Sequence, residues 1–137
     1  MRRHILIVED HAMFRDTLRR FLMTRYPDAE ISAAENGQIG VELCRQKRPD
    51  VVVMDVNMPV LDGLKACEQI KTGSPGTSVV LYSSEQLPDS AAAHSGDAFI
   101  TKQFVFEQLP NEIAELLPDS SSTSPPKNHG TFPREGK

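Results

Sequence analysis

Residues 51–63 read VVVMDVNMPVLDG, and the order of residue types in this stretch decides the fold. The apolar run from Val51 to Met54 predicts a strand that is buried on both faces, as in a parallel sheet. The run ends on an acid, Asp55, and Pro59 makes the chain turn soon afterwards. The stretch therefore predicts a buried strand that presents a carboxylate at its carboxyl end.

Apolar runs of this kind alternate along the chain with segments of helical periodicity, which is typical of β-α-β units on a parallel sheet. The expected strands are residues 4–8, 30–34, 51–54, 78–82 and 98–101, and the expected helices carry apolar stripes that begin at Phe14, Val41, Leu64 and Ile113. Between the last two strands only residues 90–94 favour a helix, so this helix should be short or irregular. The chain is predicted to form an α/β fold, with a doubly wound five-stranded parallel sheet and helices on both faces.

The composition indicates one soluble domain followed by a tail. The chain has 137 residues, of which 39% are hydrophobic and 25% charged, and no apolar run approaches the roughly 20 residues of a membrane span. Nothing resembles a secretory signal, so a cytoplasmic location is expected. Residues 118–137 are rich in Ser and Pro, which predicts a disordered tail after a domain at residues 1–117.

The charge and the cysteines argue against two other kinds of site. A formal net charge of −4 gives no reason to expect nucleic-acid binding by this chain alone. Cys44 and Cys67 lie singly within helical patterns, which predicts reduced core thiols instead of a zinc or redox site. One basic group is interpreted as the solvated face of a helix: Arg15, Arg19, Arg20 and Arg25.

Polar residues follow four of the predicted strands, at the edge of the sheet where such folds bind ligands. They are Glu9 and Asp10 after the first strand, Asp55 after the third, Ser83 after the fourth and Lys102 after the fifth. Three neighbouring carboxylates would repel one another unless a cation were present, and an oxygen-rich cluster suits Mg²⁺. The sequence therefore predicts a magnesium site at this edge.

The same residues suit phosphoryl transfer. A bound Mg²⁺ that keeps open positions accepts phosphate oxygens, while Lys102 supplies a countercharge and Ser83 a hydroxyl donor. Carboxylates form acyl-phosphate intermediates, so Asp55 is the candidate nucleophile.

Four motifs in this order carry a resemblance to a known family: ILIVEDH, VVVMDVNMPVLDG, VVLYSS and FITKQF. From residue 4 to about residue 117 the chain resembles the CheY-like receiver domain of two-component response regulators. The resemblance implies a flavodoxin-like sheet with strand order 2-1-3-4-5. It also implies a phosphorylation-dependent switch that is not a turnover enzyme, although it accepts a phosphoryl group and loses it by autodephosphorylation.

The resemblance assigns a role to each matching residue. The implied roles are phosphoacceptor for Asp55, metal-side acids for Glu9 and Asp10, a carbonyl metal ligand for Asn57, phosphoryl sensing for Ser83, phosphoryl binding for Lys102, aromatic switch for Phe99, and tuning of dephosphorylation for Asn57 and Glu85. Phosphorylation would draw Ser83 inward, let Phe99 rotate, and alter the face formed by residues 90–94, the last strand and the last helix.

The implied phosphodonor is a histidine kinase, a phosphotransfer protein or a small phosphodonor, and the output is binding to an unidentified protein. A phosphorylation-linked dimer is left open. The stretch VEDHAMFRDTLRRFL also resembles the opening of receivers that precede a DNA-binding domain. A stand-alone receiver is expected because the tail is short, and the receiver part of a longer DNA-binding transcriptional regulator is the rival.

Three departures from the family pattern leave alternatives open. Glu9 replaces the more usual aspartate, and Gln103 replaces the proline that usually follows the lysine, so the isomer of the Lys102–Gln103 bond is undecided. The stretch from Ser83 to Lys102 is also shorter than is typical. An adaptor that signals without phosphorylation (a pseudo-receiver) therefore stays an alternative.

Two further alternatives carry less weight. A phosphatase of the haloacid dehalogenase type also places an aspartate after an apolar strand, but Asn57 occupies the place of its second acid. His11 is interpreted as a loop residue instead of a metal ligand.

Overall fold

The structure, a computed structural model, describes residues 2–85 and 95–117. Its elements are β1 (His4–Val8), α1 (Ala12–Arg25), β2 (Glu30–Ala34), α2 (Gly37–Lys47), β3 (Val51–Asp55), α3 (Gly63–Gly73), β4 (Ser78–Ser83), β5 (Ala98–Thr101), a 3₁₀ turn (Lys102–Phe104) and α4 (Val105–Leu116). Strands β3 and β4 include Asp55 and Ser83 as their last residues, one residue beyond the predicted ends. The predicted helix at residues 90–94 and the predicted disordered tail lie outside the described residues.

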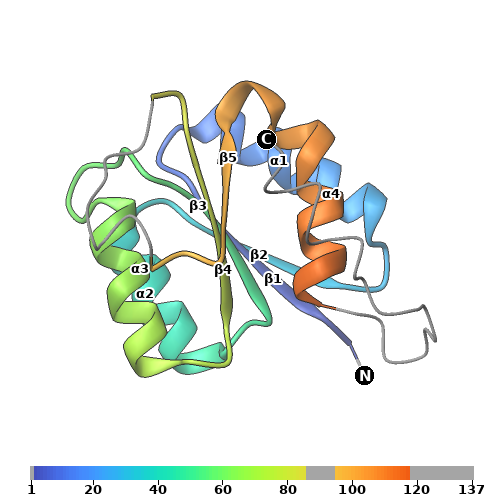
Figure 1. Ribbon diagram of the computed structural model, residues 1–137. Helices are drawn as coiled ribbons and strands as arrows, with labels where there is room; N and C mark the ends of the chain where they lie inside the picture. Colours follow the sequence, from blue (N-terminus) through green and yellow to red (C-terminus); the bar gives the residue numbers. More distant parts are fainter. Residues whose placement is uncertain (1, 86–94, 118–137) are drawn as a thin grey trace.

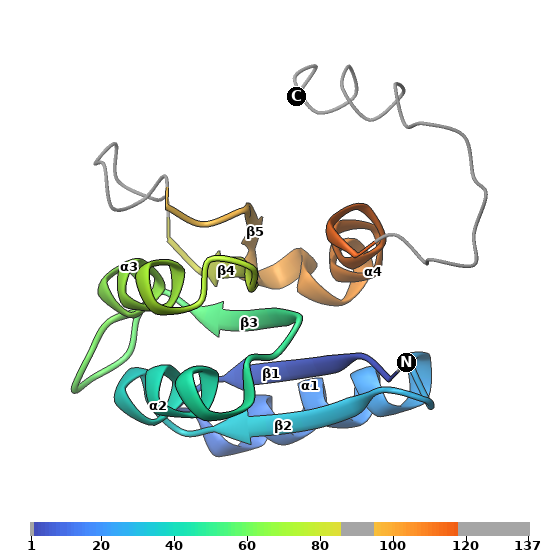
Figure 2. The same ribbon diagram turned by 90° about the horizontal axis from the view of Figure 1, so that it is seen from below.

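The five strands form one parallel sheet in the order β2-β1-β3-β4-β5, which confirms the predicted fold class. Helices α2 and α3 cover one face of the sheet, and α1 and α4 cover the other (Figures 1 and 2). The chain reverses its direction of winding between β1 and β3. In open parallel sheets this reversal opens a crevice at the carboxyl ends of the two strands.

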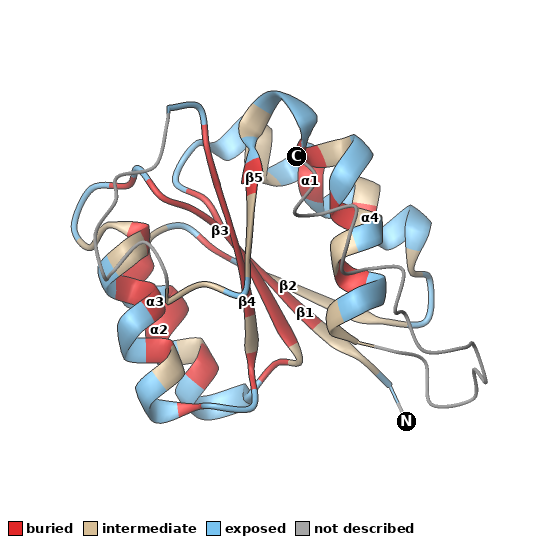
Figure 3. Ribbon diagram, in the orientation of Figure 1, coloured by how far each residue is buried: buried red, intermediate tan, exposed pale blue. Residues whose placement is uncertain are grey.

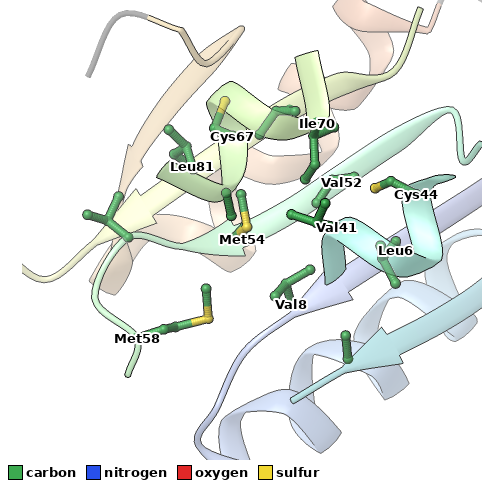
Figure 4. Close-up of a cluster of buried hydrophobic side chains, with 14 residues drawn as sticks. Leu6, Val8, Val41, Cys44, Val52, Met54, Met58, Cys67, Ile70 and Leu81 are labelled. Atoms are coloured by element: carbon green, nitrogen blue, oxygen red, sulfur yellow. The ribbon is translucent and has the colours of Figure 1, made fainter. Parts of the chain in front are cut away.

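Each face of the sheet carries its own apolar core, because side chains along a strand point alternately to opposite faces. The core under α2 and α3 includes Leu6, Val52, Met54, Cys44 and Cys67, several of which Figure 4 shows interleaved. In Figure 3 buried residues run through the central strands and along the inner sides of the helices. The burial of both free thiols confirms the prediction of core cysteines.

Side-chain caps set where three helices begin, just beyond the carboxyl ends of strands. The side chains of His11, Asn36 and Asp62 each accept a hydrogen bond from the backbone N–H three residues further on. His11 thus has a structural role, since its Nδ1 atom lies 3.3 Å from the backbone nitrogen of Phe14. None of the helices in the described part of the chain is long and apolar enough to cross a membrane.

Candidate functional site

Three carboxylates meet at the reversal point of the sheet. Glu9 and Asp10 directly follow β1, and Asp55 ends β3. One carboxylate oxygen from each residue lies within 4.8 Å of the other two, so the structure brings together the acids that the sequence placed at this edge. Glu9 and Asp55 are buried whereas Asp10 is exposed, which leaves the cluster open to solvent on one side.

Asp55 is the most strongly perturbed of the three acids. Burial raises its pKa to about 6 from the ordinary 3.8; the N–H of Asn57 opposes the rise, and the negative charge of Glu9 adds to it. The Asn57 nitrogen lies 3.1 Å from Oδ1 of Asp55. Burial and the neighbouring acids make the negative charge of Asp55 unfavourable, and a bound cation would stabilise that charge. Carboxylate oxygens are among the ligands that Mg²⁺ accepts. The cluster therefore fits a magnesium ion.

Lys102 supplies positive charge next to Asp55. Its Nζ atom lies 3.7 Å from Oδ2 of Asp55 and 4.5 Å from the ring centroid of Phe14. The Lys102–Gln103 bond is trans, which answers the question that Gln103 raised. The lysine reaches Asp55 with this isomer, so the departure from the family pattern does not remove the ion pair.

Ser83 links the remaining predicted residues next to the acidic cluster. Its Oγ atom accepts hydrogen bonds from the Asn57 side-chain nitrogen at 3.3 Å and from the Glu85 backbone nitrogen at 3.0 Å. Ser83 itself is buried, while Asn57 and Glu85 are exposed. The Ser83 hydroxyl group is therefore held at the end of β4, between two residues that are exposed to solvent.

Phe99 lies in β5, the strand next to the β4 strand that ends at Ser83. In β5 it pairs with Leu81 and packs, half-buried, against the core under α2 and α3. Ser83 instead pairs with Thr101. Phe99 and Ser83 are thus on neighbouring strands but not directly opposite, and the switch role of Phe99 stays a prediction.

Two contacts at the site were missed from the sequence. The hydroxyl group of Tyr82 donates a hydrogen bond to Oε1 of Glu9, and Nη1 of Arg15 donates to the Glu9 carbonyl at 2.8 Å. Arg19, Arg20 and Arg25 are exposed, as the interpretation of a solvated helix face expects, whereas Arg15 is half-buried and contacts the loop after β1. A tyrosine in the apolar run VVLY was the available signal, since a buried hydroxyl needs a partner.

Burial and the negative charge of Glu9 together raise the pKa of Tyr82 well above its usual value. Tyr82 consequently stays protonated at neutral pH and can only donate to the carboxylate. Glu9, with an exposed fraction of 1%, receives this donor and also the His11 N–H, at 3.0 Å from Oε2.

Residues 5–114 match the family of the response regulator receiver domain. The chain belongs to this family. The motif-based resemblance is thereby confirmed, and the chain is a receiver domain of two-component signalling. Domains of this family are signalling modules and not classical turnover enzymes.

Two curated relatives show how far the similarity of this receiver domain extends. The chemotaxis protein CheY of Halobacterium salinarum is 32% identical over 120 residues, which cover 85% of this chain and 98% of that protein. The response regulator MprA of Mycobacterium sp. strain KMS is 34% identical over 128 residues, or 88% of this chain and 55% of that protein. The chain thus spans nearly all of one relative and about half of the other.

Solved structures agree with the fold. The response regulator TrrA of Thermotoga maritima, solved in complex with Mg²⁺ and BeF, has a TM-score of 0.77 and 25% identity, covering 84% of this chain and 99% of that one. TrrA was also solved with the histidine kinase ThkA; there the TM-score is 0.75, the identity 25%, and the coverage 84% and 98%.

Proposed function

We propose that this receiver domain is a phosphorylation switch that accepts a phosphoryl group on Asp55 in the presence of Mg²⁺. The proposal is carried by one observation: the buried carboxylate of Asp55 has Lys102 Nζ at 3.7 Å and oxygens of two further acids within 4.8 Å. This arrangement supplies a nucleophile, a countercharge and a cation site together. Those are the parts that phosphoryl transfer requires.

The chemistry is a displacement at phosphorus. An Asp55 carboxylate oxygen forms the new P–O bond as the P–N bond of a phosphohistidine breaks, and the departing imidazole keeps the electron pair and takes up a proton. Lys102 would neutralise a phosphoryl oxygen, and the Ser83 hydroxyl group, whose oxygen accepts both of its present hydrogen bonds, would donate its proton to another. Mg²⁺, when bound, neutralises further oxygens; Glu9, Asp10, Asp55 and the Asn57 carbonyl are the residues that would hold it.

A histidine kinase, a phosphotransfer protein or a small phosphodonor would supply the phosphoryl group. The similarity to TrrA, which was solved with a histidine kinase, supports a kinase as the donor. We further propose that residues 1–117 act as a complete receiver and that the output is binding of a protein by the face that includes β5 and α4. Ser83 and Phe99 would transmit phosphorylation to that face.

Intact-mass measurement tests the proposal. After incubation with Mg²⁺ and acetyl phosphate, the wild-type protein should gain about 80 Da, whereas Asp55→Ala should gain nothing. Asp10→Asn should be phosphorylated more slowly at low Mg²⁺ because it removes a metal-side charge. An unmodified wild type, or a modified Asp55→Ala variant, would contradict the proposal.

A further inference from the structure

Glu9 and Tyr82 are joined across the sheet by a hydrogen bond from the Tyr82 hydroxyl group to Oε1 of Glu9. Strand β3 lies between β1 and β4, so the two backbones are separated by about 10 Å, twice the spacing of neighbouring strands. Two long side chains close this gap, and both are inaccessible, with exposed fractions of 1% for Glu9 and 0% for Tyr82. A shorter aspartate at position 9 would not reach the hydroxyl group.

The carboxylate of Glu9 is therefore fixed from two directions. Tyr82 holds Oε1, and the backbone N–H of His11 holds Oε2 at 3.0 Å. The same carboxylate belongs to the acidic cluster with Asp10 and Asp55. Mutation of a residue that orients a metal-side carboxylate in this way typically lowers metal affinity or activity by roughly 10–100-fold.

The ring of Tyr82 lies close to the other charged neighbour of Asp55. Lys102 Nζ is 5.9 Å from the Tyr82 ring centroid and 4.5 Å from that of Phe14, both within the range of cation–π attraction. The centroids of the Phe14 and Tyr82 rings are 5.7 Å apart, and the ring planes are tilted by 55° to each other. The ammonium group of Lys102 lies near both rings and 3.7 Å from Oδ2 of Asp55.

We propose that Tyr82 is a positioning residue of the phosphoryl site, which fixes Glu9 with its hydroxyl group and supports Lys102 with its ring. The inference rests on the proposed function, and it deepens that function by giving one buried side chain a role on both sides of Asp55. The hydroxyl group and the ring act on different partners. Substitutions that remove them separately therefore have separable effects.

Calorimetric titration with Mg²⁺ tests the hydroxyl group. Tyr82→Phe keeps the ring and leaves one oxygen of Glu9 without its donor, so the dissociation constant for Mg²⁺ should rise about tenfold. Tyr26→Phe is the matched control, because Tyr26 caps the end of α1 and contacts Arg25 instead of the site. Glu9→Asp should weaken binding similarly, and the double variant with Tyr82→Phe should add little further loss.

Tyrosine fluorescence gives an independent readout. The chain has two tyrosines and no tryptophan, so in Tyr26→Phe the emission comes from Tyr82 alone. Mg²⁺ should change that emission with a midpoint equal to the calorimetric dissociation constant, because the cation and the hydroxyl group share Glu9. A merely structural tyrosine would not respond to the cation.

The rate of phosphorylation by acetyl phosphate at saturating Mg²⁺ tests the ring. Tyr82→Leu, which removes the ring, should be phosphorylated about fivefold more slowly than Tyr82→Phe, which keeps the ring. Thermal unfolding of each variant identifies any that do not fold, and Tyr82→Phe keeps the inference testable if Tyr82→Leu is one of them.

The outcomes separate this inference from the proposed function. Equal or tighter Mg²⁺ binding by Tyr82→Phe, in a wild type that binds Mg²⁺ and is phosphorylated, would overturn the inference alone. A wild type that binds no Mg²⁺ would overturn both.

Discussion

Asp55, the proposed phosphoacceptor, is a buried carboxylate whose negative charge is costly in the absence of a cation. Its pKa of about 6 in the folded protein exceeds the ordinary 3.8, so the folded state binds the proton more tightly than the unfolded state does. The resulting stabilisation is complete below the ordinary pKa and is lost as the pH rises through about 6. At neutral pH the ionised Asp55 therefore destabilises the fold.

Asp55→Asn should consequently raise the free energy of unfolding at about pH 7, without divalent cations, by roughly 2 kcal/mol. Urea denaturation in the presence of a chelator measures the difference. Repeated below the ordinary pKa of 3.8, the experiment should show no gain, because Asp55 is then neutral in both states. A variant less stable than the wild type at neutral pH would show that the attraction between Asp55 and Lys102 outweighs the cost of burying the Asp55 charge.

Asn57 and Glu85 are the residues predicted to tune the loss of a phosphoryl group from Asp55. Both residues flank Ser83: the side-chain nitrogen of Asn57 and the backbone nitrogen of Glu85 each donate a hydrogen bond to its Oγ atom. We expect these exposed residues to guide water to the phosphorylated Asp55, so that the Asn57→Ala, Glu85→Ala double variant loses its phosphoryl group more slowly. The decay of the mass adduct over time measures this rate, and an unchanged decay would remove the support for their role.

At the scale of elements, the start of α3 is packed directly against the end of β3. A Cβ atom on Gly63 would lie 2.3 Å from the carbonyl oxygen of Asp55 and 2.7 Å from the Cα atom of Val56. Since both atoms belong to the backbone, Gly63→Ala must displace the acceptor strand or the helix. Only a residue without a side chain allows this close approach.

Gly63→Ala should lower the free energy of unfolding by about 1–3 kcal/mol, and it should also slow phosphorylation because Asp55 moves. Gly73→Ala, at the other end of the same helix, is the matched control: its Cβ atom would meet nothing within 4 Å. Denaturant unfolding of both variants makes the comparison. Equal stabilities would mean that the contact at Gly63 relaxes without cost.

The elements also show what sequence patterns can and cannot predict. A strand such as β1 was placed correctly because a continuous apolar run bounded by polar residues determines it. Parallel topology then brings strand-end residues together, so the meeting of Glu9, Asp10 and Asp55 was predictable. The contact between Glu9 and Tyr82 was not, because it depends on how far two side chains reach across an intervening strand.

At the scale of the whole molecule, the site and the packed core lie at different places on the same sheet. Asp55 ends the central strand β3, while Cys44 in α2 and Cys67 in α3 are buried in the core on one face of the sheet. Burial raises the pKa of Cys44 to about 12 and also raises that of Cys67. Neither thiol is a reactive thiolate while the helices remain packed.

Both cysteines should therefore resist a thiol reagent such as DTNB in the native protein and react only when the α2–α3 layer opens. Under the proposed function Mg²⁺ would bind the native state at the edge of the sheet and stabilise it by mass action, so labelling of the wild type should slow as Mg²⁺ is added. Asp55→Asn weakens that binding, and its labelling rate should respond less. Rapid labelling of the native protein, or a rate indifferent to Mg²⁺ in a protein that binds it, would mean that the helical layer opens independently of the site.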